Sequence, residues 1–107
     1  MKVINLTPHD VNICDELGNI IMCYPKSGKV ARIDHDYKTF ARLGDVPVVR
    51  RVDEEVINLP KPQKDVMYIV SNVLMNHCSD RLDLLAPVQQ VKVNGKVVGC
   101  QAFMSNR

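Results

Sequence analysis

The chain has 107 residues, 46% of them hydrophobic and 24% charged, which predicts a single domain over residues 1–107 with one modest core. Its net charge of +2 is too small for the basic face of a duplex nucleic-acid binder, although it would help a small anion to arrive. The sequence has no run of about 20 apolar residues that could cross a bilayer, and MKVINLTPHD lacks the apolar region of a signal peptide, so we expect a cytoplasmic protein without a membrane partner.

The first third of the chain predicts short strands separated by turns. Residues 2–5 (KVIN) and 10–14 (DVNIC) are strand-like and flank a Thr-Pro-His-Asp turn cluster. The polar residues 15–19 lead into a further strand, IIMCY, which predicts a hairpin. A turn at 25–28 precedes KVARID, whose alternation is typical of a strand, and residues 35–44 fit either one helical turn or an irregular excursion.

The middle of the chain contains β-branched strands and one helix. VPVVRRV predicts a strand that ends at Asp53-Glu54-Glu55, which we interpret as a solvated loop before VINLP. VMYIV, from residue 66, is typical of a buried strand. The spacing then changes to three and four, which predicts a helix over 72–78 with Ser71 or Asn72 as N-cap.

The carboxy-terminal segment predicts a hairpin, because Asn94-Gly95 is flanked by alternating apolar residues. Gly99, within the second strand, suggests a bulge or a close backbone approach. The predicted fold class is therefore α+β: a small, mostly antiparallel sheet with one short helix covering it and a hairpin around Asn94-Gly95.

The cysteines and histidines give little support to metal or catalytic chemistry. The four cysteines (14, 23, 78 and 100) form no CxxC motif and are expected to be reduced thiols, with no metal and no cofactor. His77-Cys78 are adjacent on the predicted helix and face each other poorly, and KSGK at 26–29 lacks the spacing of a phosphate-binding loop. We therefore expect a protein that is not an enzyme.

Arginine is the more informative residue type. Arg32 lies inside an alternating strand, Arg50 and Arg51 end a strand, and Arg81 follows the helix. A guanidinium binds a phosphate or carboxylate with two parallel hydrogen bonds. Each of these residues alone is most simply a surface side chain, but three separate positions at the ends of a small sheet raise the odds that some converge on an anion.

The Arg81-Leu82-Asp83 segment allows two interpretations. Residues two apart in an extended segment point to the same side, so Arg81 and Asp83 could share one ligand, the first at a phosphate and the second at a sugar hydroxyl. They could equally form an internal salt bridge that orders the loop, and residue chemistry alone slightly favours that alternative.

Six segments together resemble a known family: INLTPHDVNI, PKSGKVARI, VPVV with NLP downstream, MYIVSNVL, SDRLDLLAP and NGKVVGCQAF. In their order and spacing over nearly the whole chain they are similar to the first-described type of Thoeris anti-defence sponge proteins of phages and prophages, although no single segment is specific. The resemblance implies a non-enzymatic protein of the host bacterial cytoplasm that sequesters a cyclic ADP-ribose isomer, such as glycocyclic ADP-ribose, and so blocks Thoeris immunity.

The resemblance also implies an assembly and a site. Such proteins assemble through dimers, some into hexamers, with the signal held between subunits, and some hold a cyclic trinucleotide in a second pocket. Such a ligand, a dianionic pyrophosphate with two riboses and one adenine, needs Arg or backbone N–H donors for the phosphates, a carboxylate or amide for ribose hydroxyls and a flat side chain for the base. The residues of this chain that could supply them are Arg32, Arg50, Arg51, Asn72, Arg81, Asp83, Gln101 and Phe103.

One departure and one alternative accompany this prediction. Relatives commonly carry Arg in the carboxy-terminal G-C-x-x-F element, where this chain has Gln101, which puts one phosphate contact and the choice of isomer in question. The alternative function is a small phage structural or adaptor module that acts through protein contacts.

Overall fold

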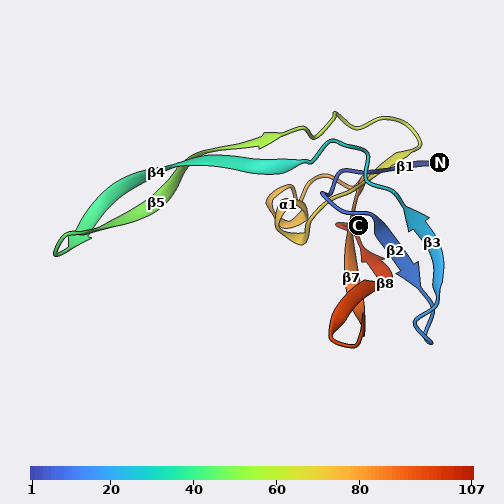
Figure 1. Ribbon diagram of the computed structural model, residues 1–107. Coiled ribbons are helices and arrows are strands. Elements are labelled where there is room, and N and C mark those ends of the chain that lie inside the picture. Colours follow the sequence, from blue (N-terminus) through green and yellow to red (C-terminus); the bar gives the residue numbers. More distant parts are fainter.

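The computed structural model describes residues 1–107 and consists mainly of strands, with one short helix (Figure 1). Six strands form one sheet in the order β1-β6-β7-β8-β2-β3, whereas β4 and β5 pair only with each other. The elements are β1 Lys2–Asn5, β2 Val11–Cys14, β3 Ile20–Tyr24, β4 Arg32–Leu43, β5 Val46–Ile57, β6 Val66–Ile69, α1 Asn72–His77, β7 Leu84–Val93 and β8 Lys96–Met104.

The six-stranded sheet is mixed rather than mostly antiparallel. The pairs β2·β3 and β7·β8 are antiparallel, as adjacent strands joined by short turns must be. The pairs β1·β6, β6·β7 and β2·β8 are parallel. Each parallel pair joins strands separated by other elements, so no short turn dictates the direction of the second strand. The α+β class holds, with the helix on one face of this sheet.

The core lies on both sides of β6. Tyr68 and Val70 belong to one buried cluster with Leu74 and Met75 of α1, whereas Ile69 belongs to a second cluster on the other side. Because successive side chains of a strand alternate between its faces, an unbroken apolar run such as VMYIV is what a strand buried on both faces requires.

The helix was predicted from its spacing and is present. Ser71 is the N-cap, and its hydroxyl accepts a hydrogen bond from the Leu74 backbone N–H at 3.2 Å. At the other end the Cys78 N–H donates to the Leu74 carbonyl. With six residues, this helix is far too short to span a bilayer, and no other helix occurs.

The β7·β8 hairpin turns at Asn94 and Gly95, whose φ angles of 52° and 79° are both left-handed. Two left-handed residues are the requirement of the two-residue turn that matches strand twist. In β8, Gly99 runs close to β2, because a Cβ at this position would lie 2.6 Å from the Cys14 sulfur.

The β4–β5 hairpin, called the arm from here on, extends away from the rest of the protein (Figure 1). The radius of gyration is 17.1 Å, against about 13 Å for a compact domain of this length. The helical turn considered for 35–44 and the loop predicted at 53–55 are both wrong, since both segments are strand. The second is interrupted only by a register shift beside Asp53, which has a φ of 55°.

Candidate functional site

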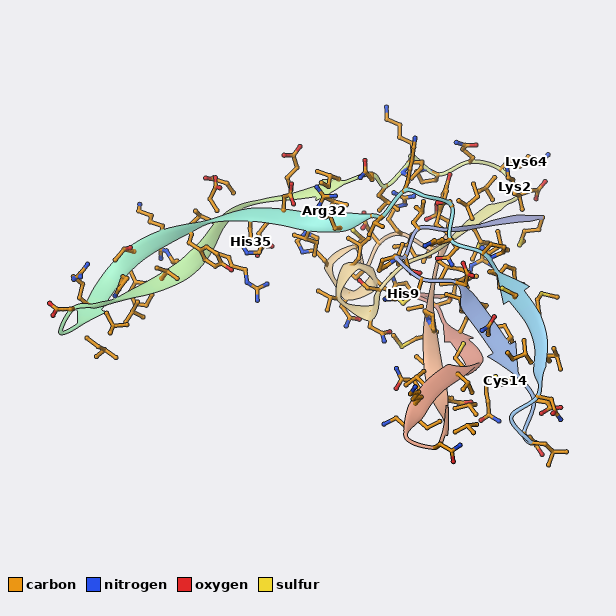
Figure 2. The ribbon with its side chains drawn as sticks, viewed as in Figure 1. Lys2, His9, Cys14, Arg32, His35 and Lys64 are labelled. Atoms are coloured by element: carbon orange, nitrogen blue, oxygen red, sulfur yellow. The ribbon has the colours of Figure 1, made fainter.

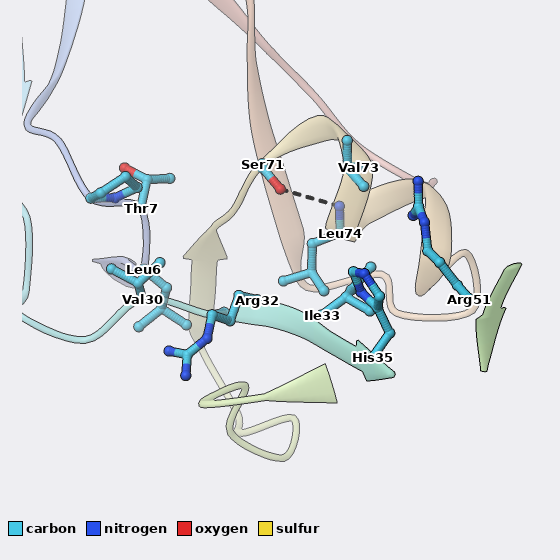
Figure 3. Close-up of a pocket in the computed structure, with 12 residues that line it drawn as sticks. Leu6, Thr7, Val30, Arg32, Ile33, His35, Arg51, Ser71, Val73 and Leu74 are labelled. Carbon is cyan, nitrogen blue, oxygen red and sulfur yellow. Dashed lines mark hydrogen bonds between the residues drawn. The ribbon is translucent and has the colours of Figure 1, made fainter. Parts of the chain in front are cut away.

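The structure contains two clefts large enough to hold part of a small molecule. The first, called the arm-base cleft, has a volume of about 290 Å³ and lies where the arm meets α1 (Figure 3). Its lining residues are Leu6, Thr7, Pro8, Val30, Ala31, Arg32, Ile33, His35, Arg51, Ser71, Val73 and Leu74. The second, of about 310 Å³, lies over β2 and β8 and includes Asn12, Gln90 and Gly99.

The pairing register of the two arm strands determines which arm residues face the cleft. Tyr37 pairs with Arg51 across the two strands, and directly opposed residues share one face of a hairpin. His35, two positions before Tyr37, therefore lies on that same face, and its ring meets the Tyr37 ring edge-on at 5.0 Å. This face packs at its base on the apolar side chains of Ile33 and Leu74, which line the cleft.

The opposite wall is held by a turn around Asn5. The buried Asn5 amide donates to the carbonyls of His9 (2.8 Å) and Tyr24 (2.9 Å), and its oxygen accepts from the Thr7 N–H at 2.9 Å. This network is the physical reason for the Thr-Pro-His-Asp turn seen in the sequence, and it fixes Thr7 beside the cleft.

The polar groups of the arm-base cleft are cationic or neutral. Arg51 contributes a guanidinium group, whereas the guanidinium of Arg32 points away from His35 and Leu74 (Figure 3), and none of the twelve lining residues carries a carboxylate. Nε of Arg32 donates to Asp34 at 3.2 Å, while Arg51 takes part in no ion pair. The His35 Nδ1 atom is buried without a hydrogen-bond partner. A cleft with these groups favours an anionic ligand that also has a flat ring.

Arg81 and Asp83 lie outside this cleft and bind each other. Nε and Nη2 of Arg81 donate to the two carboxylate oxygens, both at 2.8 Å, and Nη2 also donates to the Pro60 carbonyl at 2.8 Å. The hydrogen bond from Arg81 lowers the pKa of Asp83, and the same bond raises the pKa of Arg81. The geometry is that of the internal salt bridge, and a ligand role for the pair stays a prediction.

The other predicted residues are dispersed over the molecule. Arg50 is on the face of β5 opposite to Arg51. Asn72 is exposed at the start of α1, between the lining residues Ser71 and Val73. On β8, Gln101 Nε2 donates to the Asp15 carbonyl at 3.3 Å, and Phe103 is half-buried against the edge of Tyr24 at 5.8 Å.

Of the eight predicted site residues, only Arg32 and Arg51 line the arm-base cleft, and they lie at opposite ends of it (Figure 3). The sequence analysis missed His35, Thr7 and Ser71 as cleft residues. His35 could have been found from its spacing of two from Ile33 and Tyr37, but that signal requires residues 35–44 to be recognised as a strand.

The cysteines and His77 do not form a reactive centre. All four thiols are free, with Cys14 and Cys100 buried, and burial raises the pKa of Cys78 and of Cys100. His77 Nδ1 lies 3.5 Å from Glu54 of the arm rather than against a thiol. No three His, Cys, Asp or Glu side chains are grouped so that they could hold a metal ion.

The chain matches no protein-family model, no curated protein and no solved structure. Its resemblance to the sponge family therefore depends on the six sequence segments alone.

Proposed function

We propose that the protein is a non-enzymatic anti-defence protein that binds and sequesters a cyclic ADP-ribose-type nucleotide, such as glycocyclic ADP-ribose, in the host bacterial cytoplasm and thereby blocks Thoeris immunity. The observation that carries this proposal is the arm-base cleft, where Arg51 and His35 lie beside an apolar floor and none of the lining residues carries a carboxylate. The resemblance in sequence supplies the class of ligand.

Each part of such a ligand has a counterpart at the cleft. Arg51, which takes part in no ion pair, is the phosphate donor of the cleft. The hydroxyl of Thr7 and the amide of Asn72 suit the ribose hydroxyls. The edge-on pair of His35 and Tyr37 offers flat surfaces for the base.

The size of the cleft supports a site completed by a second subunit. Its volume of about 290 Å³ is at the lower bound of the roughly 300–1,000 Å³ usual for small-molecule pockets. We therefore propose an assembly built from dimers, which some members of the resembled family extend to hexamers. Arg50, Arg81, Asp83, Gln101 and Phe103 belong to the proposed site only as contacts from another subunit. A cyclic trinucleotide could bind at the second cleft, which none of these five residues lines.

The test is capture followed by heat release. The protein is incubated with glycocyclic ADP-ribose, freed of unbound nucleotide and heat-denatured, and the released nucleotide is identified by chromatography and mass spectrometry. Intact nucleotide is expected. A degraded product would show an enzyme instead, and the absence of any captured nucleotide would count against the proposal.

The residues are tested by calorimetric titration. Arg51→Ala removes a charge-assisted contact worth about 1.5–3 kcal/mol, so affinity should fall about tenfold to more than a hundredfold. Arg42→Ala is the matched control, because this arginine lies on the same arm but its Nη2 donates to the Asp45 carbonyl at the arm tip. Equal affinities for both variants would remove Arg51 from the site.

The second candidate function is a phage structural or adaptor module, and the exposed arm favours it. Tyr37, Phe40 and Leu43 are 66%, 61% and 74% exposed, which suits contact with a protein. A thermal shift separates the two functions: ligand at 100 times its dissociation constant stabilises the folded state by about 2.7 kcal/mol. No shift with any cyclic nucleotide would favour the module.

A further inference from the structure

The arm lacks the packing that normally stabilises a hairpin. Beyond its base it touches no other part of the protein, and its side chains stand in solvent on both faces (Figure 2). An isolated two-stranded hairpin is at best marginally stable in water. Its outer half nevertheless exposes large apolar side chains, including Leu43 and Val46, which are 74% and 62% exposed. Exposed apolar side chains grouped in this way indicate a surface that contacts a partner.

The charges on one face of the arm indicate what that partner is. Directly paired residues share a face, so one face carries the successive pairs Arg32–Ile57, Asp34–Glu55, Asp36–Val52, Lys38–Arg50, Ala41–Val48 and Leu43–Val46. We call this the charged face; His35, Tyr37 and Arg51 are on the other. At the base Arg32 is ion-paired with Asp34. The unpaired charges are acidic at Asp36 and Glu55 and basic at Lys38 and Arg50, and the tip is apolar.

Two of these pairs place like charges directly opposite each other. Asp34 faces Glu55 and Lys38 faces Arg50, an arrangement that destabilises a sheet. Arg32 offsets only Asp34, at 3.2 Å, while Lys38, Arg50, Asp36 and Glu55 take part in no ion pair. The two like-charge pairs are four residues apart, about 13 Å along a strand, which exceeds the screening length of about 10 Å at 0.1 M salt. Asp36, two residues before Lys38 and about 7 Å from it along the strand, is a nearer carboxylate, but it forms no ion pair. One carboxylate beside two cations leaves the basic pair with an excess of positive charge within one arm.

A second copy of the same face satisfies these charges. In a two-fold symmetric contact, residue i meets residue j of the other copy and j meets i. Suppose that two charged faces pack antiparallel, with the two-fold axis crossing the strands between Asp36 and Lys38. Lys38 and Arg50 of each copy then lie opposite Asp36 of the other copy. The same arrangement covers the apolar tip, Leu43 and Val46, with the base of the other arm.

We propose that the arm is a dimerisation element, which packs antiparallel through its charged face on the same face of a second copy of this chain. This names the element that makes the dimers proposed above, and it requires no bound nucleotide. Each strand has twelve residues, so one face covers about 40 Å by 10 Å. The flat footprint is therefore about 400 Å². Each partner in a typical stable interface contributes about 800 Å² of accessible surface, which is twice the flat footprint, and the side chains that stand out from the hairpin add accessible surface to it.

Charge reversal tests the proposal. The molar mass of the full chain is measured without nucleotide by light scattering and sedimentation at micromolar concentrations, and a dimer or a multiple of it is expected. Lys38→Glu with Arg50→Glu should raise the dimer dissociation constant at least about tenfold, because each reversed pair turns attraction into repulsion on both sides of the axis. Adding Asp36→Lys and Glu55→Lys reverses the two acidic residues of this face that have no ion pair, leaves the Arg32–Asp34 pair in place and should restore the dimer.

The matched control is Lys92→Glu with Lys96→Glu, which changes the same number of charges on the exposed β7·β8 hairpin and should leave the dimer intact. Circular dichroism checks that all variants fold. A monomeric wild-type protein would overturn the proposal and leave the arm to a partner of another kind. So would a wild-type dimer that the first double variant leaves intact, or a folded fourfold variant that stays monomeric. If dimers form but no nucleotide is captured, only the proposed function is wrong.

Discussion

The Arg81–Asp83 ion pair gives the sharpest test of what holds the loop after α1. Its side chains are only 18% and 14% exposed, and the guanidinium also donates to the Pro60 carbonyl. The Arg81→Ala substitution would leave the Asp83 carboxylate without its partner and the carbonyl without a donor. Hydrogen bonds to charged groups contribute about 1.5–3 kcal/mol each, so we expect a loss of about 2 kcal/mol in the free energy of unfolding. This corresponds to a fall in Tm of roughly 8–16 °C for a domain of this size.

A second Arg-x-Asp pair provides the matched control. Arg32 and Asp34 have the same spacing, but their side chains are 56% and 55% exposed. An exposed pair contributes at most about 1 kcal/mol, so Arg32→Ala should lower Tm by no more than a few degrees. Thermal and urea unfolding followed by circular dichroism measure both variants. If Arg81→Ala proves no more destabilising than Arg32→Ala, the burial-based estimate fails.

The effect should also depend on pH. The hydrogen bond from Arg81 lowers the pKa of Asp83 in the folded protein, below the value of about 3.9 in the unfolded chain. A depressed folded pKa contributes stability that is complete above the unfolded pKa and is lost as the pH falls towards the folded one. The difference in stability between wild type and Arg81→Ala should therefore be constant near neutral pH and shrink below about pH 4. A difference that grows in acid would contradict this assignment.

Three further predictions concern packing and the thiols. Leu74→Ala, at a buried position of α1, should cost about 2–5 kcal/mol in the free energy of unfolding, whereas Leu82→Ala, half-exposed, should cost about 0.5 kcal/mol or less by the same urea titration. Gly99→Ala should cost about 1–3 kcal/mol, because its Cβ would lie 2.6 Å from the Cys14 sulfur, and a wild-type melting curve would refute that close approach. Thiol titration without reductant should find all four cysteines free after denaturation but only Cys23 reacting rapidly in the folded protein, and fewer free thiols after denaturation would contradict this.

The sequence predicts best those parts of the fold whose side chains are buried on one or both faces. The strand VMYIV and the helix that follows could be predicted because burial imposes a pattern of apolar residues. The pattern is continuous for the strand and spaced by three and four for the helix. The outer part of the arm could not be predicted from the sequence, for the opposite reason. Both of its faces are exposed along most of its length, so residues 35–44 show no alternation that would identify a strand.

The candidate site depends on a register that the sequence does not reveal. Arg50 and Arg51 are adjacent, and only the second lines the arm-base cleft, because Arg51 pairs with Tyr37 on the face of His35. A shift of one residue in the pairing would exchange the two arginines between the faces. From the sequence alone, arginines could therefore be predicted to converge, but neither the one that enters the cleft nor the histidine beside it could be chosen.

The two faces of the arm have different proposed roles, ligand binding for one and dimerisation for the other. One face carries Arg51 and His35 to the cleft, and the other carries the like-charge pairs, of which only Asp34 is ion-paired within the same chain, with Arg32. A monomer would be more stable with opposite charges paired across the strands, an exchange that needs only one substitution at each level. Lys38 opposite Arg50 and Asp34 opposite Glu55 therefore weaken the isolated arm, and they become favourable only where a second arm brings the opposite block. On the proposed arrangement, the assembly that binds the nucleotide is built by the same hairpin that presents the phosphate-binding arginine, so cleft and dimer would form together.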